Sequence, residues 1–490
     1  MRVLKKLEKK FGTWFLIFVS FIFFVFRLPS LFEPYWYGDE GIYQTLGIGI
    51  NHGRLLYRDI FDNKPPLLYL LYSFFSSDQF MVRLANLFFG ILAVIIFFIL
   101  VNKLFKSKLS VYSSTGFFAF LLAIPLLEGN IANAENFMLF PLILAGYLIF
   151  SACQKLNYKV FFVSGLLVGI AFLFKIVAIF DFAAFFVFLL FSDINFRFSK
   201  LINKKYLICL LDKAFLFILA FLVPISLTIL FFYISGGFSY FLKATLFSNV
   251  GYVGYGNRFI IPQGLLILKL LILAFFSFFV FAKRKSLELE GVFIFLWLGF
   301  SLFNAFFSQR PYTHYLLVLL PSFSLLIGFI FTNKKWRNSS TVLLLLIAYL
   351  VFNNFYLFNK VVPYYENFLN FADGKKSLSA YQGFFDRRTP IDYQIADYLR
   401  PRLKENDNVF IWGNNAQVYK LLEKLPPGRY AAAYHISNYK DGMDDTAGGL
   451  AKNKPKFIIL MPNVKAYPFL LSDFKQSIIL YDVSIYEKIF

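Results

Sequence analysis

About eleven apolar runs of roughly 20 residues, the length of a membrane-spanning helix, dominate this sequence. A soluble fold cannot bury so much apolar surface, because 59% of the residues are hydrophobic and only 16% are charged. The runs therefore predict an α-helical polytopic membrane protein and argue against a soluble enzyme, a disordered chain or a nucleic-acid-binding domain. They lie at approximately 12–32, 80–102, 110–127, 136–153, 158–174, 176–192, 214–235, 263–282, 290–308, 312–332 and 340–358.

Positive charge alternates regularly between the segments that connect these runs. The formal net charge is +21, yet segment 128–135 contains neither Lys nor Arg. Cytoplasmic connections are enriched in Lys and Arg, so the pattern predicts a cytoplasmic N-terminus, an extracytoplasmic C-terminal segment and a location in the cell (plasma) membrane. The cations are expected to contact membrane lipids and not nucleic acid. The cation-rich segments are 1–11, 103–109, 154–157, 193–213, 283–289 and 333–339.

The topology divides the chain into two predicted domains. Residues 1–358 form a transmembrane domain whose first outer loop, 33–79, is long, and residues 359–490 form a small extracytoplasmic α/β domain. Within this tail, alternating strand and helix patterns are typical of an α/β unit. Buried strands are expected at 408–412, 456–460 and 477–481, with a helix at 416–423.

Two adjacent acids, Asp39 and Glu40, follow the first apolar run directly. A carboxylate at the boundary between membrane and water is partly desolvated, which raises its basicity and suits it to act as a general base. A solvated loop end is the alternative interpretation of the pair. The acids are therefore candidates for catalysis at the outer face.

Cations follow the acids in the same loop, at Arg54, Arg58 and Lys64. Arg binds a phosphate through a bidentate fork and Lys binds it as a point charge. Isolated cations at this depth are more often contacts to lipid headgroups. Acid, cation and an apolar segment together indicate a site for a lipid phosphate whose head group reacts outside the membrane.

The loop resembles the first external loop of polytopic GT-C glycosyltransferases, in particular the protein O-mannosyltransferases and the bacterial lipid A aminoarabinose transferases. In that family an Asp-Glu pair follows the first helix, and many bacterial members have Lys-Pro-Pro-Leu about 25 residues later. The fold implied by the resemblance covers about residues 1–330. The matching motifs are Asp39-Glu40, Lys64-Pro65-Pro66-Leu67, Arg83, Asn133-Ala134-Glu135-Asn136 and Arg310-Pro311-Tyr312-Thr313-His314-Tyr315.

The resemblance implies an enzyme that moves a sugar from a polyprenyl phosphate to an acceptor hydroxyl with inversion of configuration. By this carry-over, Asp39 is the base, Glu40 a supporting acid and Glu135 a residue that orients the acceptor. The acceptor class, whether lipid, glycan or protein, stays open. No cofactor is expected; a divalent metal is conceivable at the acids, but the sequence does not require one. The substrate-binding residues implied are Lys64, which would bind the phosphate, and Arg58, Arg83, Arg310, His314 and Tyr43.

The alternative function is a transporter or flippase of lipid-linked saccharides, without catalysis. Such a protein needs charged groups along a route through the bundle, and only Lys175 and Asp181 stand out within the apolar runs. We expect these two residues to form a structural ion pair with each other. The charged motifs lie instead on one predicted side, which favours transfer chemistry.

Overall fold

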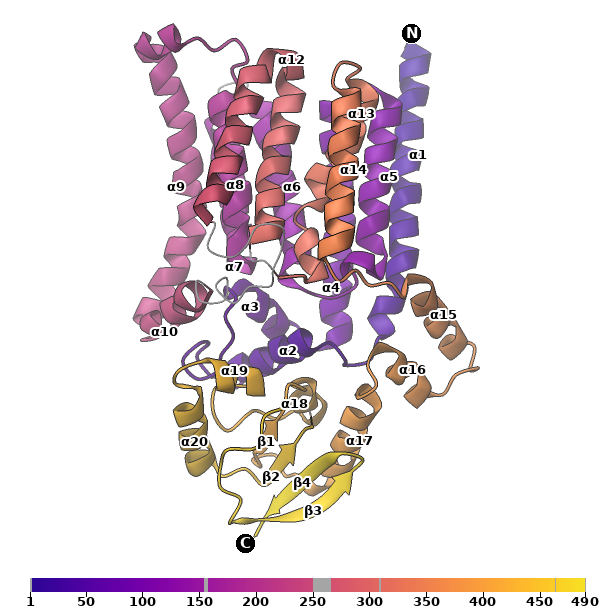
Figure 1. Cartoon of the computed structure of the whole chain (residues 1–490), viewed down its shortest axis with the longest axis vertical. Helices are drawn as coiled ribbons and strands as arrows, with labels where there is room; N and C mark the ends of the chain where they lie inside the picture. Colours follow the sequence, from indigo (N-terminus) through magenta and orange to yellow (C-terminus); the bar gives the residue numbers. More distant parts are fainter. Residues whose placement is uncertain (1, 154–156, 250–265, 308–309, 463, 490) are drawn as a thin grey trace. The chain divides into compact units, whose positions relative to one another are not determined.

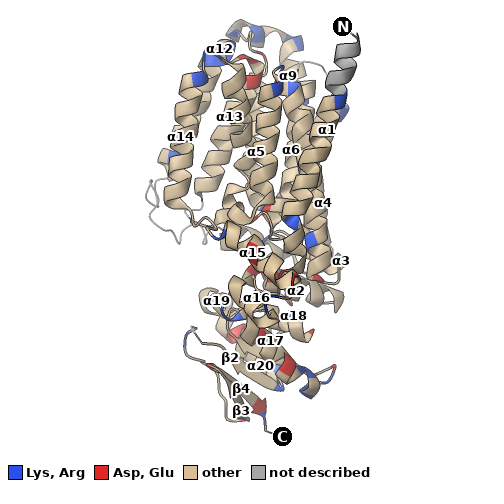
Figure 2. Ribbon diagram, turned by 90° about the vertical axis from the view of Figure 1, so that its right-hand side faces the viewer, with Lys and Arg blue, Asp and Glu red and all other residues tan. Residues whose placement is uncertain are grey.

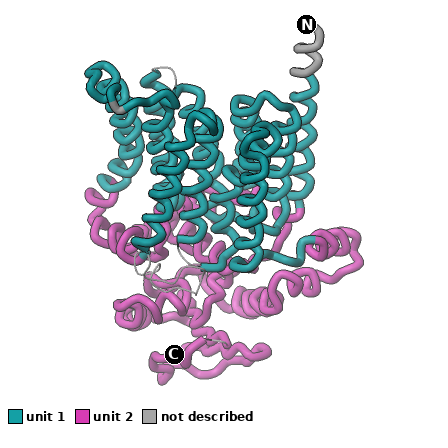
Figure 3. Tube along the Cα trace, turned by 45° about the horizontal axis from the view of Figure 1, so that its top comes forward, with its two compact units in different colours: residues 1–28, 85–230, 249–361 teal, residues 29–84, 231–248, 362–490 magenta. Residues whose placement is uncertain are grey.

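The protein is described by a computed structural model covering residues 2–153, 157–249, 266–307, 310–462 and 464–489. The chain divides into two compact units, which Figure 3 colours separately. Unit 1 comprises residues 1–28, 85–230 and 249–361, and unit 2 comprises residues 29–84, 231–248 and 362–490. Most of the predicted first loop and most of the tail therefore belong to the same unit.

Unit 1 is a bundle of long apolar helices (Figure 1). Each predicted apolar run coincides with a helix or with part of one, so the helical prediction is confirmed. The run at 312–332 begins with a short 3-10 turn, and its α-helix starts only at Leu320. The helices are α1 (Arg2–Arg27), α4 (Gln79–Leu104), α5 (Lys108–Ala123), α6 (Ala134–Ala152), α7 (Tyr158–Phe174), α8 (Ile179–Phe191), α9 (Lys204–Ile234), α12 (Leu266–Phe307), α13 (Leu320–Thr332) and α14 (Arg337–Asn354).

The lengths and composition of these helices support an integral membrane protein. Among the described residues, five helices are long enough and apolar enough to cross a membrane, and three further apolar helices are shorter. Figure 2 shows few charged residues along the middle of these helices. The number of spans and their orientation stay predictions.

Helix α12 covers two predicted runs because the chain reverses inside it. Glu288 has φ 59° and ψ 178°, which no α-helical residue adopts, so the helix is broken there. The two halves then pack against each other, as Figure 1 also shows. A Cβ added at Gly299 would lie 2.7 Å from the ring of Phe276 in the other half, so only glycine permits this approach.

Unit 2 contains helices where the sequence predicted an irregular first loop. Helix α2 (Gly38–Asn51) begins just before the acidic pair, and α3 (Leu67–Phe74) follows the Lys-Pro-Pro motif. A short helix, α10 (Phe238–Leu242), comes from the predicted second outer loop at 236–262. The rest of that loop from residue 250 lies outside the described residues.

The tail of unit 2 is an α/β domain, as predicted. Its four-stranded sheet has the order β1-β2-β4-β3, with β1 and β2 parallel and the other neighbours antiparallel. The strands are β1 (Val409–Trp412), β2 (Phe457–Leu460), β3 (Phe474–Leu480) and β4 (Val483–Lys488). The helices are α15 (Val361–Ala372), α16 (Leu378–Phe385), α17 (Thr389–Leu399), α18 (Gln417–Leu422), α19 (Ala433–Asn438) and α20 (Gly442–Asn453).

The predicted tail elements were correct at the centre of the sheet and wrong at its edge. The strands at 408–412 and 456–460 and the helix at 416–423 are confirmed as β1, β2 and α18. The strand expected to be buried at 477–481 is β3, which is largely exposed because it lies at the edge of the sheet. Strand β4, paired with β3 in a tight hairpin, was not predicted.

Candidate active site

Asp39 lies in the first turn of α2, where the helix dipole favours a negative charge. One turn later on the same face, the Tyr43 hydroxyl donates a hydrogen bond of 3.0 Å to Asp39 Oδ2. The Asp39 side chain is 38% exposed, whereas that of neighbouring Glu40 is 2% exposed. Of the two predicted acids, Asp39 is therefore the one that a reactant can reach.

The Lys64 ammonium lies between two carboxylates of unit 2. Its Nζ is 3.6 Å from Asp39 Oδ2 and 3.5 Å from Asp62 Oδ2. It also lies 4.8 Å from the centre of the Tyr43 ring, within the range of a cation–π contact. The structure thus brings together three residues that the sequence predicted for the site: Asp39, Lys64 and Tyr43.

The backbone of Lys64 is fixed by two buried tyrosines. The Tyr57 hydroxyl donates to the Lys64 carbonyl at 2.7 Å, and the Lys64 amide donates to the Tyr69 hydroxyl at 3.1 Å. Pro65 and Pro66, which follow, restrict the backbone further because a proline ring fixes φ. The motif therefore holds the lysine in place from its main chain as well as from its side chain.

Asp62 belongs to this cluster although the sequence analysis did not select it. Its side chain is 3% exposed. It accepts hydrogen bonds of 2.8 Å from the Tyr69 hydroxyl at Oδ2 and from the Asn63 amide at Oδ1. The available signal was its position two residues before Lys64, inside the motif.

His435, from α19 in the tail, completes the cluster. Its Nε2 lies 3.7 Å from Asp62 Oδ1, and its side chain is 4% exposed. Burial lowers the pKa of His435 to about 4, although Asp62 opposes the shift. The imidazole is therefore neutral at physiological pH. We call Asp39, Tyr43, Asp62, Lys64, Tyr69 and His435 the Asp39–Lys64 cluster.

Tyr43 is a hydrogen-bond donor in this cluster at any working pH. Burial raises the pKa of its phenol well above the ordinary value of 10.0, and Asp39 and Asp62 raise it further. A protonated phenol at Asp39 Oδ2 orients the carboxylate. Tyr43 thus acts on the acid in this unliganded structure.

Helix α18 of the tail packs directly on α2. A Cβ added at Gly41 would lie 2.4 Å from the backbone nitrogen of Gln417, so α2 can approach this closely only with glycine there. Asp392 of α17 is buried and accepts hydrogen bonds from the side-chain amides of Asn415 and Gln417, at 3.0 and 2.8 Å. The tail therefore supports the helix that carries Asp39.

Glu40 and Arg83 form a buried ion pair. The Arg83 guanidinium lies 2.5 Å from Glu40 and 2.8 Å from Glu33, and its side chain is 0% exposed. It also donates to the Ser30 carbonyl at 2.8 Å. Arg83 was predicted to bind substrate, but in this structure it has no surface to offer and instead fixes the start of α2.

Arg58 is engaged by its neighbour. Its Nε and Nη2 each donate to the Asp59 carboxylate at 2.8 Å, and its side chain is 43% exposed. This bidentate contact lowers the pKa of Asp59, with the Arg58 hydrogen bond as the main cause. The structure gives Arg58 this partner and no contact with Asp39 or Lys64 among those described.

A second group of charged residues lies in unit 1. Glu135, in the first turn of α6, pairs with Lys175, whose Nζ lies 4.3 Å from the centre of the Tyr315 ring. His314 Nε2 is 3.8 Å from Glu135 Oε1, and its Nδ1 is 2.9 Å from Glu128 Oε2. We call Glu128, Glu135, Lys175, His314 and Tyr315 the Glu135 cluster, which contains two predicted site residues, Glu135 and His314.

The expected pair between Lys175 and Asp181 was wrong. Lys175 ends α7 and pairs with Glu135, while Asp181 accepts a hydrogen bond of 2.8 Å from the Trp297 indole. The reason is that the chain changes direction between α7 and α8, so spacing along one helix did not apply. Arg310, also predicted, is partly buried and lies four residues before His314, just ahead of the 3-10 turn.

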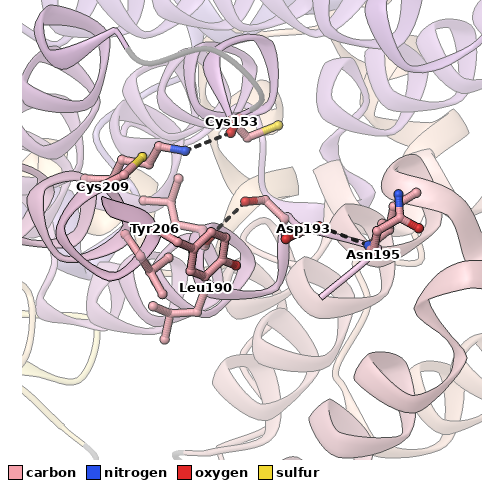
Figure 4. A pocket seen from close by; sticks show the side chains of 11 residues that line it. Cys153, Leu190, Asp193, Asn195, Tyr206 and Cys209 are labelled. Atoms are coloured by element: carbon pink, nitrogen blue, oxygen red, sulfur yellow. Dashed lines mark hydrogen bonds between the residues drawn. The ribbon is translucent and has the colours of Figure 1, made fainter. Parts of the chain in front are cut away.

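A cavity of about 350 Å³ lies elsewhere in unit 1, at the ends of α6, α8 and α9. Figure 4 shows Cys153, Asp193 and Tyr206 among its lining residues. Its polar groups are engaged with each other: Lys213 donates to the Cys153 carbonyl at 3.1 Å, and Asp193 pairs with Lys200 at 2.6 Å. No predicted site residue lines this cavity.

Metal binding was left open by the sequence. Among the described residues, no group of three or more His, Cys, Asp and Glu side chains is arranged to hold a metal ion. The carboxylates of the Asp39–Lys64 cluster contact cationic or hydroxyl groups of the protein instead. The predicted independence from a metal is still to be tested.

Comparison with known proteins agrees with the resemblance found in the sequence. Residues 63–236 match the sequence model of the dolichyl-phosphate-mannose-protein mannosyltransferase family. The matched segment begins beside the Lys64-Pro-Pro motif and includes Glu135 and Lys175. This match supports a transferase. A search of curated protein sequences found no match.

The fold is similar to that of a solved GT-C enzyme. The structure of ArnT from Cupriavidus metallidurans bound to undecaprenyl phosphate matches with a TM-score of 0.57 and 13% identity, over 97% of this chain and 98% of that one. The predicted GT-C fold is thereby confirmed. The oligosaccharyltransferase AglB from Archaeoglobus fulgidus, in complex with an inhibitory peptide and a dolichol-phosphate, matches with a TM-score of 0.49 and 13% identity, over 92% and 69% of the two chains.

Proposed function

We propose that this protein is a membrane glycosyltransferase that moves a sugar from a polyprenyl-phosphate donor to an acceptor hydroxyl. The reaction occurs at the extracytoplasmic face and inverts the anomeric configuration. The observation that carries the proposal is the position of the Lys64 ammonium 3.6 Å from the exposed carboxylate of Asp39. A base and a phosphate-binding cation at this spacing suit the two ends of a displacement reaction.

Asp39 is the general base. It is the most exposed acid of its cluster, and the Tyr43 hydroxyl orients it. It takes the proton of the acceptor hydroxyl as that oxygen forms a bond to the anomeric carbon. Asp62 is unsuited to this role because its side chain is 3% exposed, and Glu40 because it is paired with Arg83.

Lys64 stabilises the leaving group. As the bond between the anomeric carbon and the phosphate oxygen breaks, negative charge grows on the polyprenyl phosphate, and a fixed cation there lowers the barrier. Binding costs little reorganisation, because the tyrosine contacts already fix the backbone of Lys64. The bound undecaprenyl phosphate in the solved ArnT structure supports this donor class.

A direct assay tests the proposal. Membranes containing the wild type should transfer label from at least one radiolabelled sugar in a panel of polyprenyl-phosphate donors to membrane extracts. Asp39→Asn should lose at least about a hundredfold in turnover, the usual scale for a general base. Asp59→Asn, which changes an acid of the same loop, is the matched control and should keep its activity.

The same assay separates transfer from transport. A flippase would move labelled lipid between leaflets without attaching the sugar to any acceptor. Absence of transfer from every donor, together with movement of the lipid, would replace the enzyme with the transporter. Undiminished transfer by Asp39→Asn would instead remove Asp39 as the base.

The proposed face can be tested independently. Lys440 is an exposed residue of the tail, and the native Cys153 and Cys209 are both free thiols. In a background with both cysteines replaced by serine, Lys440→Cys should react with a membrane-impermeant label on intact cells. Labelling only after lysis would place the tail in the cytoplasm and contradict the proposed face.

A further inference from the structure

The tail is tied to the catalytic loop next to Asp62. The Phe61 amide donates to the Arg429 carbonyl at 2.9 Å, and Phe61 and Tyr430 form an isolated parallel β-bridge. The two rings also pack, with centroids 5.1 Å apart. A backbone contact of this kind fixes the register between the loop and the tail at the residue before Asp62.

His435 is held beside Asp62 by aromatic packing. Its ring meets Phe61 edge-on at 5.7 Å and lies 4.2 Å from the ring of Tyr434. The imidazole Nδ1 is buried without a hydrogen-bond partner in the described part of the chain. The ring is therefore fixed with Nε2 toward the Asp62 carboxylate, at 3.7 Å.

The Asp62 carboxylate joins His435 to Lys64. Its Oδ1 faces His435, while its Oδ2 lies 3.5 Å from the Lys64 ammonium and accepts the Tyr69 hydroxyl. A change at one oxygen rotates the whole carboxylate, and the position of Lys64 changes with it. A neutral imidazole can fix the carboxylate without neutralising it, whereas a cation would compete for it.

We propose that His435 is a positioning residue, which orients Asp62 so that Lys64 is held where the lipid phosphate binds. This role rests on the proposed function of Lys64 and assigns the tail a part in donor binding. His435 acts through Asp62 and touches no reactant. Its loss should therefore weaken the binding of the donor and leave the acceptor step unchanged.

The test measures binding of undecaprenyl phosphate to the detergent-solubilised full chain. Lys64→Met should weaken binding by at least about tenfold, the loss expected for a charge-assisted contact. His435→Phe keeps the aromatic packing but removes the nitrogen, and we expect about a fivefold loss. His435→Gln, whose amide can reach the position of Nε2, should stay within about twofold of the wild type.

A double substitution shows whether the effect passes through Asp62. If it does, His435→Phe added to Asp62→Asn should weaken binding no further than Asp62→Asn alone. Multiplying losses would overturn the proposal, because His435 would then act independently. In turnover assays, His435→Phe should raise the KM for the donor and leave the KM for the acceptor unchanged; equal changes in both would indicate a loss of structure only.

Two further outcomes separate the two proposals. If the wild type does not bind undecaprenyl phosphate, the proposed function of Lys64 fails. If the wild type binds and Lys64→Met does not, but His435→Phe matches the wild type, only the role of His435 fails. Should His435→Phe not fold, His435→Gln against His435→Asn decides, since the shorter amide cannot reach the position of Nε2 and should bind more weakly.

Discussion

The Asp39–Lys64 cluster of unit 2 and the Glu135 cluster of unit 1 contain the same components. Each has a lysine over a tyrosine ring, with Nζ 4.8 Å from the Tyr43 centroid and 4.3 Å from the Tyr315 centroid. Each also has an acid in the first turn of a helix and a histidine near a carboxylate. Residue types alone do not distinguish the two.

Exposure and pairing distinguish them. The Asp39 side chain is 38% exposed and its lysine is shared with a second acid, whereas Glu135 is 2% exposed and pairs closely with Lys175. A buried pair costs desolvation energy and holds its partners in place, while a partly exposed pair can exchange a partner for a substrate. The comparison indicates that the first cluster reacts and the second one supports the bundle.

The largest expected effect concerns the exposed acid. Asp39→Asn should lower kcat by about 10²- to 10⁴-fold, because amide nitrogen cannot accept the proton. The thermal unfolding temperature in detergent should change little, since the pair it breaks is partly exposed. A large loss of stability would mean that Asp39 resembles Glu135 and would remove the distinction.

The next effect concerns the buried pair. Lys175→Met leaves Glu135 as a buried charge without its ammonium partner, which should cost about 3–5 kcal/mol of stability. Lys64→Met is the matched substitution in the other cluster and should cost less than about 1 kcal/mol. Unfolding curves of both variants in the same detergent measure the difference, and equal losses would contradict the comparison.

The support of the Asp39–Lys64 cluster should depend on pH through Asp392. Burial raises the pKa of Asp392 from 3.8 to about 7. Folding therefore favours its protonated form, so the stability that this group contributes is present at low pH and is lost as pH rises from about 4 to about 7. The change is on the order of 4 kcal/mol.

Proteolysis of the tail at pH 5 and pH 8 measures this effect. The wild-type tail should be cleaved more readily at pH 8, and Asp392→Asn should reduce the difference between the two conditions. Segment 134–152, which carries Glu135, should show no such dependence. Equal cleavage of the wild-type tail at both values would contradict the assigned protonation.

The smallest effect is expected at Arg58. Because its guanidinium binds Asp59 at the surface, Arg58→Ala should change the KM for the donor by less than about twofold. Lys64→Met in the same assay should raise it at least about tenfold. A comparable increase for both would place Arg58 at the phosphate, as the sequence had predicted.

The sequence predicted the bundle well because apolar length determines where helices form in a membrane. Asp39, Lys64 and Tyr43 were also predicted correctly as neighbours, since a family motif of fixed spacing contains the first two. The break at Glu288 was foreseen as a boundary between two runs, although its geometry was not. These features depend on residues that are close together in the chain.

The rest could not be predicted because it depends on contacts between distant segments. His435 is far from Asp62 in sequence, and no motif marks it; only the folded tail brings the two side chains together. Arg83 looked like a substrate ligand because burial between Glu33 and Glu40 is invisible in one dimension. Lys175 likewise found a partner on another helix.

The close approach of Gln417 to Gly41 has a practical meaning for anyone who shortens the protein. A fragment ending at residue 358 would retain the acidic helix and the lysine but would expose the face of α2 on which α18 rests. Such a truncated protein should still insert into membranes and yet be inert. A solubility screen would then score it as a success, and only a functional readout would detect the loss.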